Sequence, residues 1–169
     1  MRIIILFLFM ISSSFGQKDV FAIARNGTVE EMKVLFEKDP KGVNEVDKYG
    51  FSPLILASYR GNFEVAKYLI TIVKDINYQS PEGTALMAAV MRNNTELILL
   101  LIEKKANLDL TSQTGVTALM LATQFKNIEI IKILLQNKAN KLLKDNEGKT
   151  AFEYAVNTNN ETIIKLLKQ

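Results

Sequence analysis

The residues best suited to catalysis are a pair of adjacent carboxylates and a Gly-Lys-Thr tripeptide. Glu30 and Glu31 are of the type that acts as general acid and base, but they stand at the start of a predicted helix, where the positive end of the helix dipole accounts for them. Gly148-Lys149-Thr150 matches the end of a phosphate-binding loop, but the upstream glycine that such a loop needs is missing. We therefore predict no catalytic residue.

The chain of 169 residues contains neither cysteine nor histidine. Without cysteine it has no disulfide, thiolate nucleophile or zinc–sulfur site. Without histidine it lacks the usual proton shuttle near neutral pH and the commonest metal ligand. These absences exclude most hydrolase and metalloenzyme designs, and we predict neither a metal nor a cofactor. The enzyme alternative that stays open is a hydrolase with a two-carboxylate or Ser–Lys site.

The formal charge of +3 is modest although the pI is about 9.0. Because nothing titrates between the carboxylates and the lysines, a small lysine excess lifts the pI far. We therefore predict no nucleic-acid binding. A basic strip formed by Lys138, Lys141 and Lys144, near Lys104 and Lys105, surrounds two predicted helix ends. It has two interpretations, which are favourable charge at helix C-termini and docking of an acidic partner.

Residues 1–16 have the layout of a secretory signal peptide. Arg2 precedes an apolar run from Ile3 to Ile11, and a polar stretch of mostly small residues follows up to Gly16. Nine apolar residues reach only about 14 Å as a helix, whereas a hydrocarbon core is about 30 Å thick. The segment resembles Sec signals of Gram-negative bacteria. We predict cleavage before Gln17, no membrane span afterwards, and a periplasmic or secreted protein; the alternatives are an uncleaved anchor or an N-terminal core strand.

The rest of the chain repeats itself. Ser52, Thr84, Thr117 and Thr150 are separated by 32, 33 and 33 residues. The same spacings relate four further columns, namely Leu54, Leu86, Leu119 and Phe152; Ala57, Ala89, Ala122 and Ala155; Asn62, Asn94, Asn127 and Asn160; and Leu69, Leu101, Leu134 and Leu167. Only one residue is deleted, before Thr84. A fixed period of this length is typical of repeat proteins.

Each column has a structural reason. The Ser/Thr column predicts the N-cap of a first helix, and the Asn column predicts the N-cap of a second helix. Gly61, Asn93 and Asn159 suit a left-handed residue at the end of the first helix, whereas Lys126 fits that role poorly. Apolar pairs such as Val65-Ala66 and Tyr68-Leu69 give the second helix a core-facing stripe.

Gly50-Phe51-Ser52-Pro53-Leu54-Ile55-Leu56-Ala57 resembles the G-x-T-P-L-H-x-A signature of the ankyrin-repeat family, and residues 115–122 and 148–152 are looser copies. The resemblance covers about residues 18–169. It implies an all-α solenoid of stacked antiparallel helix pairs. We predict a domain over residues 17–169 with about five units, at about 18–46, 47–78, 79–111, 112–144 and 145–169.

Two departures from the family pattern affect the loops. Ile55, Met87, Met120 and Glu153 replace the histidine that the family uses for hydrogen bonds between loops. Val73, Lys105 and Lys138 replace the glycine after the second helix. Both changes predict looser loops than is usual in the family.

The resemblance also implies that the loop tips and the exposed side of the first helix contact a partner. Residue types enriched at interface hot spots gather there in the first three full repeats. We predict a partner-binding surface formed by Tyr49, Phe51, Tyr59, Arg60, Met91, Arg92 and Phe125. The alternative is that the aromatic side chains pack onto neighbouring repeats.

The function predicted from the sequence is an exported protein-binding module that sequesters, inhibits or scaffolds a protein partner. The alternative is an accessory or immunity-type protein that protects or neutralises a specific periplasmic enzyme or toxin. Neither the identity of the partner nor the oligomeric state follows from the residues, because contact positions are those that the fold leaves free.

Overall fold

The computed structural model describes residues 19–168, so the predicted signal peptide at 1–16 lies outside the described residues. Within this range the chain forms ten α-helices and one 3₁₀ helix, and no strand. The elements are α1 (Val20–Asn26), α2 (Val29–Lys38), the 3₁₀ helix η1 (Gly42–Asn44), α3 (Pro53–Arg60), α4 (Phe63–Ile72), α5 (Ala85–Met91), α6 (Thr95–Glu103), α7 (Ala118–Gln124), α8 (Ile128–Gln136), α9 (Ala151–Thr158) and α10 (Glu161–Lys168).

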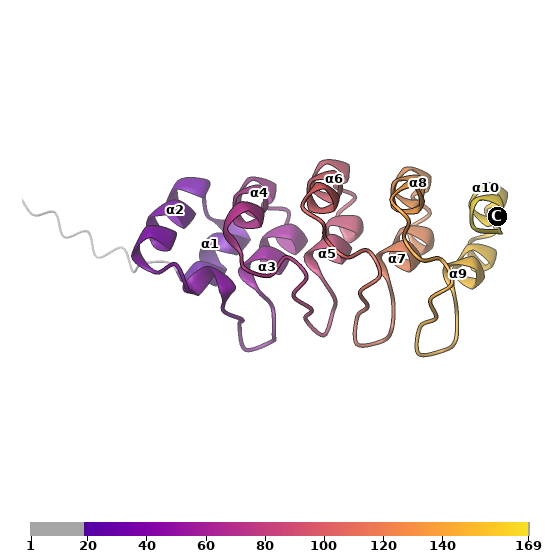
Figure 1. The fold of residues 1–169 in the computed structure, drawn as a ribbon, viewed down its shortest axis with the longest axis horizontal. Coiled ribbons are helices and arrows are strands. Elements are labelled where there is room, and N and C mark those ends of the chain that lie inside the picture. Colours follow the sequence, from indigo (N-terminus) through magenta and orange to yellow (C-terminus); the bar gives the residue numbers. More distant parts are fainter. Residues whose placement is uncertain (1–18, 169) are drawn as a thin grey trace, which may run out of the picture.

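The helices form five pairs stacked side by side, which we number as units 1 to 5 (Figure 1). The first helices α1, α3, α5, α7 and α9 make one row, and the second helices make a row above it. The long loops project from the opposite side of the first row (Figure 1). Each first helix packs against its own second helix and against the first helices of adjacent units. The predicted all-α solenoid is confirmed.

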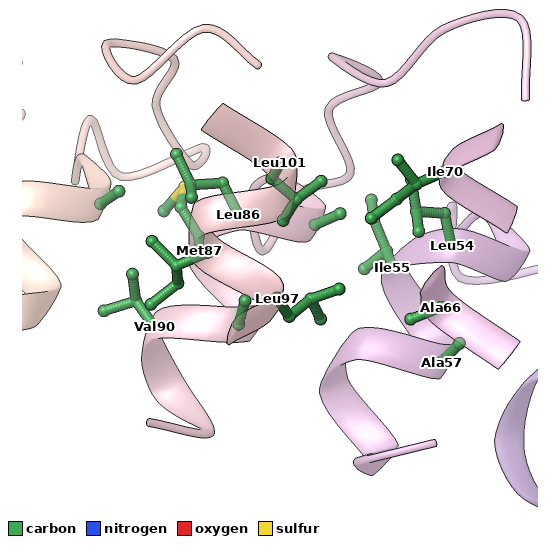
Figure 2. Close-up of a cluster of buried hydrophobic side chains, with 14 of the residues drawn as sticks. Leu54, Ile55, Ala57, Ala66, Ile70, Leu86, Met87, Val90, Leu97 and Leu101 are labelled. Carbon is green, nitrogen blue, oxygen red and sulfur yellow. The ribbon is translucent and has the colours of Figure 1, made fainter. Parts of the chain in front are cut away.

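One apolar core runs through the stack from Val20 to Leu167. The alanines of the repeat are wholly buried, which lets neighbouring helices approach closely, and the repeated leucines Leu69, Leu101, Leu134 and Leu167 are buried as well. Figure 2 shows Leu54, Ala57 and Ala66 in one unit beside Leu86 and Leu101 in the next. Because each pair buries its apolar faces against its neighbours, no unit has a separate core.

Side-chain caps begin most helices as predicted. The hydroxyls of Ser52, Thr84 and Thr117 each accept a hydrogen bond from the backbone N–H three residues later, at 3.3 Å. The Asn94 and Asn127 side chains cap α6 and α8 in the same way, at 2.8 and 3.0 Å. These caps satisfy N–H groups that have no partner within the helix.

Asn62 stands at the predicted N-cap position of α4, but it does not cap the helix with its side chain. Its side chain makes no hydrogen bond to α4. Instead, Nδ2 donates to the carbonyl oxygens of Ile23, Ala24 and Gly27, at 3.3, 3.3 and 2.9 Å. Asn62 therefore stabilises the last turn of α1 and ties unit 1 to unit 2.

Lys126 fits the left-handed region poorly by residue type, yet it adopts this conformation at the end of α7, with a φ of 57°. The Asn127 N–H donates to the Ala122 carbonyl at 3.0 Å and the Lys126 N–H to the Thr123 carbonyl at 2.9 Å. This pair of bonds defines a Schellman motif, which places its C′ residue in the left-handed region whatever its side chain.

Lys105 and Lys138 end α6 and α8 in the same conformation, with φ values of 65° and 67°. Val73, the third residue at a loop-glycine position, is instead extended. A β-branched residue is strongly disfavoured at positive φ. The loop after α4 consequently takes another path, in which the Lys74 N–H donates to the Asn44 side chain at 2.8 Å.

Replacing Lys126, Lys105 or Lys138 by glycine should raise the free energy of unfolding by about 0.5–1 kcal/mol each. Glycine removes the cost of the left-handed conformation, and its own loss of chain entropy offsets part of the gain. Urea unfolding measures the effect. The matched control is Lys132→Gly within α8, where glycine should destabilise by about 1 kcal/mol. The prediction is contradicted if glycine destabilises the protein at all three of these helix ends.

Candidate partner-binding surface

Four short turns carry the loop tips, at residues 47–50, 80–83, 112–115 and 145–148. In each turn the N–H of the last residue, a glycine with positive φ, donates to the carbonyl of the first at 2.8–2.9 Å. The turns also stack on one another. A Cβ on Gly115 would lie 2.8 Å from the backbone nitrogen of Asn146, so this turn needs glycine both for its φ and for the close approach of the next unit.

Hydrogen bonds connect neighbouring turns although the family histidine is absent. The Gln113 N–H donates to the Pro81 carbonyl at 2.9 Å, and the Asn146 N–H donates to the Thr114 carbonyl at 3.0 Å. The Tyr78 hydroxyl donates to the Gly50 carbonyl at 3.0 Å. These bonds hold the loop tips in register, in contrast to the looser loops expected from the missing histidine.

Most of the residues predicted to bind a partner are exposed. Tyr49, Tyr59, Met91 and Phe125 are large apolar or aromatic side chains with 40–63% of their surface accessible. Arg60 and Arg92 are exposed too. Phe51 differs, because it is half-buried and packs against the core. We call these seven residues the contact surface.

A pocket of about 290 Å³ lies between α3 and α5 and is lined by three members of the contact surface, Phe51, Tyr59 and Met91. The other lining residues are Ile55, Ser80, Glu82, Gly83, Thr84 and Ala88. Tyr49, Arg60, Arg92 and Phe125 do not line it. The pocket is large enough for one apolar side chain of a partner.

Two departures from the repeat leave this space open. In units 2, 4 and 5 the residue between the turn glycine and the helix cap is Phe51, Val116 or Lys149, whereas in unit 3 Gly83 is followed directly by Thr84. The deletion therefore removes one side chain at the pocket. In addition, Ala88 stands where the other units carry Leu56, Leu121 and Tyr154. The pocket therefore forms because unit 3 lacks one residue before Thr84 and carries the small residue Ala88 nearby.

Two guanidinium groups lie beside the pocket residues, at the C-terminal ends of α3 and α5. A Cβ built on Gly61 would lie 3.4 Å from a terminal nitrogen of Arg92, so Arg92 reaches back across the boundary between units 2 and 3. Among residues 19–168, neither Arg60 nor Arg92 forms an ion pair. The negative end of the helix dipole stabilises both positive charges. Both are available to an acidic group of a partner.

Ile55, Glu82 and Ala88 also line the pocket, although they were not among the residues predicted to bind a partner. Ile55 occupies the position of the family histidine, and Ala88 lies on the buried side of α5. The single-residue deletion before Thr84 was a visible signal, but which side chain it removes became clear only from the stacked turns.

The residues considered for catalysis have structural roles. Glu31 accepts a hydrogen bond from the Thr28 N–H at 2.8 Å, and Thr28 accepts one from the Glu31 N–H at 3.1 Å. This is a capping box. Lys149 pairs with Glu147 at 2.5 Å, and Thr150 caps α9.

Over residues 19–168, no three Asp or Glu side chains gather in a way that would hold a metal ion. None of the helices in that range combines the length and the apolar character needed to cross a membrane.

Asp145 anchors the last turn and carries a shifted pKa. Burial alone would raise the pKa of this carboxyl, but hydrogen bonds from the Tyr154 hydroxyl at 2.7 Å and from the backbone N–H groups of Lys149 and Glu147 lower it below its ordinary value. Burial, together with the bond to Asp145, raises the pKa of Tyr154 to about 12. The pair fixes the turn of unit 5 to α9.

A depressed carboxyl pKa stabilises the fold above the pKa of the unfolded chain, and this stability is lost as the pH falls through the folded pKa. Tyr154→Phe removes one of the bonds that lower the pKa of Asp145, so acid unfolding should begin at a higher pH. Thermal melts across the acid range measure this, with Tyr49→Phe as control because Tyr49 is exposed. An unchanged acid profile for Tyr154→Phe would contradict the prediction.

The stacked helix pairs and the loops joined tip to tip define a repeat scaffold of the ankyrin class. The family model for ankyrin repeats in three copies matches residues 7–81 and 86–169, the first match starting within the predicted signal peptide. The chain belongs to the ankyrin-repeat family. Ankyrin repeats generally mediate protein–protein interaction, and their stacks offer extended binding surfaces.

The chain is similar to Ankyrin repeat and SAM domain-containing protein 6 of Rattus norvegicus, with 33% identity over 101 residues, and to the protein of the same name in Mus musculus, with 32% identity over 101 residues. Each match covers 59% of this chain and 11% of the relative. The chain thus spans only a small part of the length of the curated relatives that it matches.

Proposed function

We propose that this protein is an exported binding module that captures a protein partner on its contact surface. The observation that carries the proposal is the pocket between α3 and α5, into which Phe51, Tyr59 and Met91 converge from two units. The repeat does not need this pocket, because the other units fill the corresponding positions with larger side chains. A feature that the fold does not require, placed among residues typical of interfaces, supports a binding role.

The side chains around the pocket suit a partner that inserts one apolar residue and carries an acidic residue beside it. The apolar side chains of Phe51 and Met91 suit an aliphatic or aromatic group, and buried anchors of this kind dominate interface energetics. Arg60 and Arg92 add two charges without an ion pair among the described residues. Charge complementarity of this kind contributes mainly to specificity and association rate.

We propose a binding function for this protein and no enzymatic activity. The carboxylate pair at Glu30 and Glu31 lies in the first turn of α2, where Glu31 completes a capping box. Holding a partner can mean sequestration, inhibition or scaffolding, and an accessory or immunity-type role toward a periplasmic enzyme or toxin is the specialised form of the same activity. The identity of the partner decides among these roles.

We propose export because residues 1–16 have the pattern of a secretory signal peptide. The proposed destination is the periplasm or the exterior of the cell. Mass spectrometry of protein recovered outside the cytoplasm should find Gln17 at the N-terminus. Protein that begins at Met1 would contradict cleavage.

The test of binding is a comparative pull-down with wild-type protein and two variants. Tyr59→Ala with Met91→Ala removes two pocket residues, and Leu99→Ala removes an exposed leucine from α6 as the matched control. We expect a partner retained by wild type and by Leu99→Ala to be lost from the double variant at an unchanged melting temperature. Equal retention by all three would reject the contact surface.

A further inference from the structure

Three side chains at one position of the repeat tie the loops of neighbouring units together. The Asn44 side chain accepts a hydrogen bond from the Lys74 N–H at 2.8 Å, and Asn77 accepts one from the Asn107 N–H at 2.7 Å. Asp109 accepts one from the Asn140 N–H at 2.7 Å. The three acceptors are 33 and 32 residues apart, so they form one column of the repeat.

Leu142 occupies the next place in this column, 33 residues after Asp109. It lacks the acceptor oxygen that the column uses, and it is 74% exposed, the most of any large apolar side chain in the described residues. A polar residue is expected at an exposed position that has no hydrogen-bonding role, because polar side chains keep the surface soluble. The leucine therefore calls for another explanation.

Leu142 borders an open groove of about 810 Å³ between α8, the loop that follows α8, and α10. Leu135 and Leu166 provide its other large apolar side chains, and Lys132 and Lys141 stand on its border. The helices α8 and α10 belong to the upper row in Figure 1, whereas the contact surface belongs to the first helices and the turns. The groove is thus separate from the pocket between α3 and α5.

The charged side chains that line the groove, Lys132 and Lys141, are both positive. None of the described residues that line it is acidic. Lys141 donates one hydrogen bond to the Leu167 carbonyl at 3.3 Å, which leaves further N–H groups of the ammonium. Lys132 is exposed, and within residues 19–168 it forms no ion pair. Lysines on the border of an apolar groove complement carboxylates that flank an apolar anchor.

We infer that the groove between α8 and α10 is a second binding site, which takes an acidic peptide segment with one aliphatic or aromatic anchor against Leu135, Leu142 and Leu166. Lys132 and Lys141 pair with acidic residues on either side of the anchor. The site allows the protein to hold two partners at once, one on each row of helices.

The experiment is a selection of random peptides displayed on phage, carried out on the purified full-length protein and on Leu142→Asn. Asparagine restores the residue type of the column at an exposed position, so the melting temperature should stay unchanged. The matched control is Val34→Asn on α2, where the valine is 64% exposed and far along the stack. We expect peptides enriched on wild type and on Val34→Asn, but not on Leu142→Asn, to share acidic residues around an apolar one.

A synthetic copy of the most enriched peptide then gives the affinity by fluorescence anisotropy. Leu142→Asn should weaken binding at least about tenfold. Lys132→Gln with Lys141→Gln should weaken it about fivefold and flatten its dependence on salt, because charges at the border of a site are screened by ions. Peptides enriched equally on wild type and Leu142→Asn, or no enriched acidic peptide, would overturn the inference. Self-association of the wild type that Leu142→Asn abolishes would overturn it too, in favour of a second copy as occupant.

Discussion

Replacing Leu101 by alanine is expected to lower the free energy of unfolding by about 2–5 kcal/mol. Leu101 lies in α6 at the middle of the stack and has none of its surface exposed. Alanine there loses the transfer free energy of the removed atoms and leaves a cavity that helices on both sides cannot collapse to fill.

Leu99→Ala is the control for this prediction, because it makes the same change two residues away in the same helix. Leu99 is 47% exposed, and its loss should change the free energy of unfolding by about 0.5 kcal/mol or less. Urea unfolding followed by circular dichroism measures both variants. Equal destabilisation by the two would mean that helix propensity, not the buried seam, decides stability.

The position of Leu101 also affects cooperativity. The stability of a repeat stack is approximately a sum of unit terms and interface terms between neighbours. Since α6 packs with α4 and α5, the substitution weakens the stack at its centre. We expect a broader transition for Leu101→Ala than for wild type, with a lower slope against urea concentration, because the two halves no longer unfold together.

The sequence predicted those parts of the fold that depend on side chains repeating at one period. The cap residues Thr84 and Thr117 and the buried alanines such as Ala122 have the same surroundings in every unit, so one physical reason predicts all copies. The aromatic residues differ. Whether Phe51 packs or stays exposed depends on its neighbour in the stack, and in the structure it does part of both.

In two places backbone hydrogen bonding at a helix end overrides the expectation from residue type. Lys126 adopts positive φ because two backbone hydrogen bonds at the end of α7 need it. Asn62 leaves its own helix uncapped because the carbonyl groups at the end of α1 offer its amide three acceptors. Neither effect has a signature in the residue type, since both depend on which backbone carbonyl groups a helix end leaves unpaired.

The pocket between α3 and α5 gives the last prediction, which is that Ala88→Leu abolishes tight partner binding without loss of stability. Leucine is the residue of this column in α3 and α7, so α5 should accept it. Its side chain would project into the pocket of about 290 Å³ and take up part of the space that an anchor from the partner needs. We expect at least a tenfold loss of affinity, about 1.4 kcal/mol, and a melting temperature that stays the same or rises as the void is filled.

Isothermal titration calorimetry with the partner recovered by the pull-down measures this effect. Ala22→Leu, at a half-buried position on α1, is the matched control and should bind like wild type. If Ala88→Leu lowers the melting temperature, inserting valine between Gly83 and Thr84 tests the same idea, because it restores the length of the repeat and the side chain that unit 3 lacks. Retained affinity in a stable variant of either kind would show that the partner does not use the pocket. Loss in both, with Leu99→Ala unaffected, would tie binding to the one place where this repeat departs from its own period.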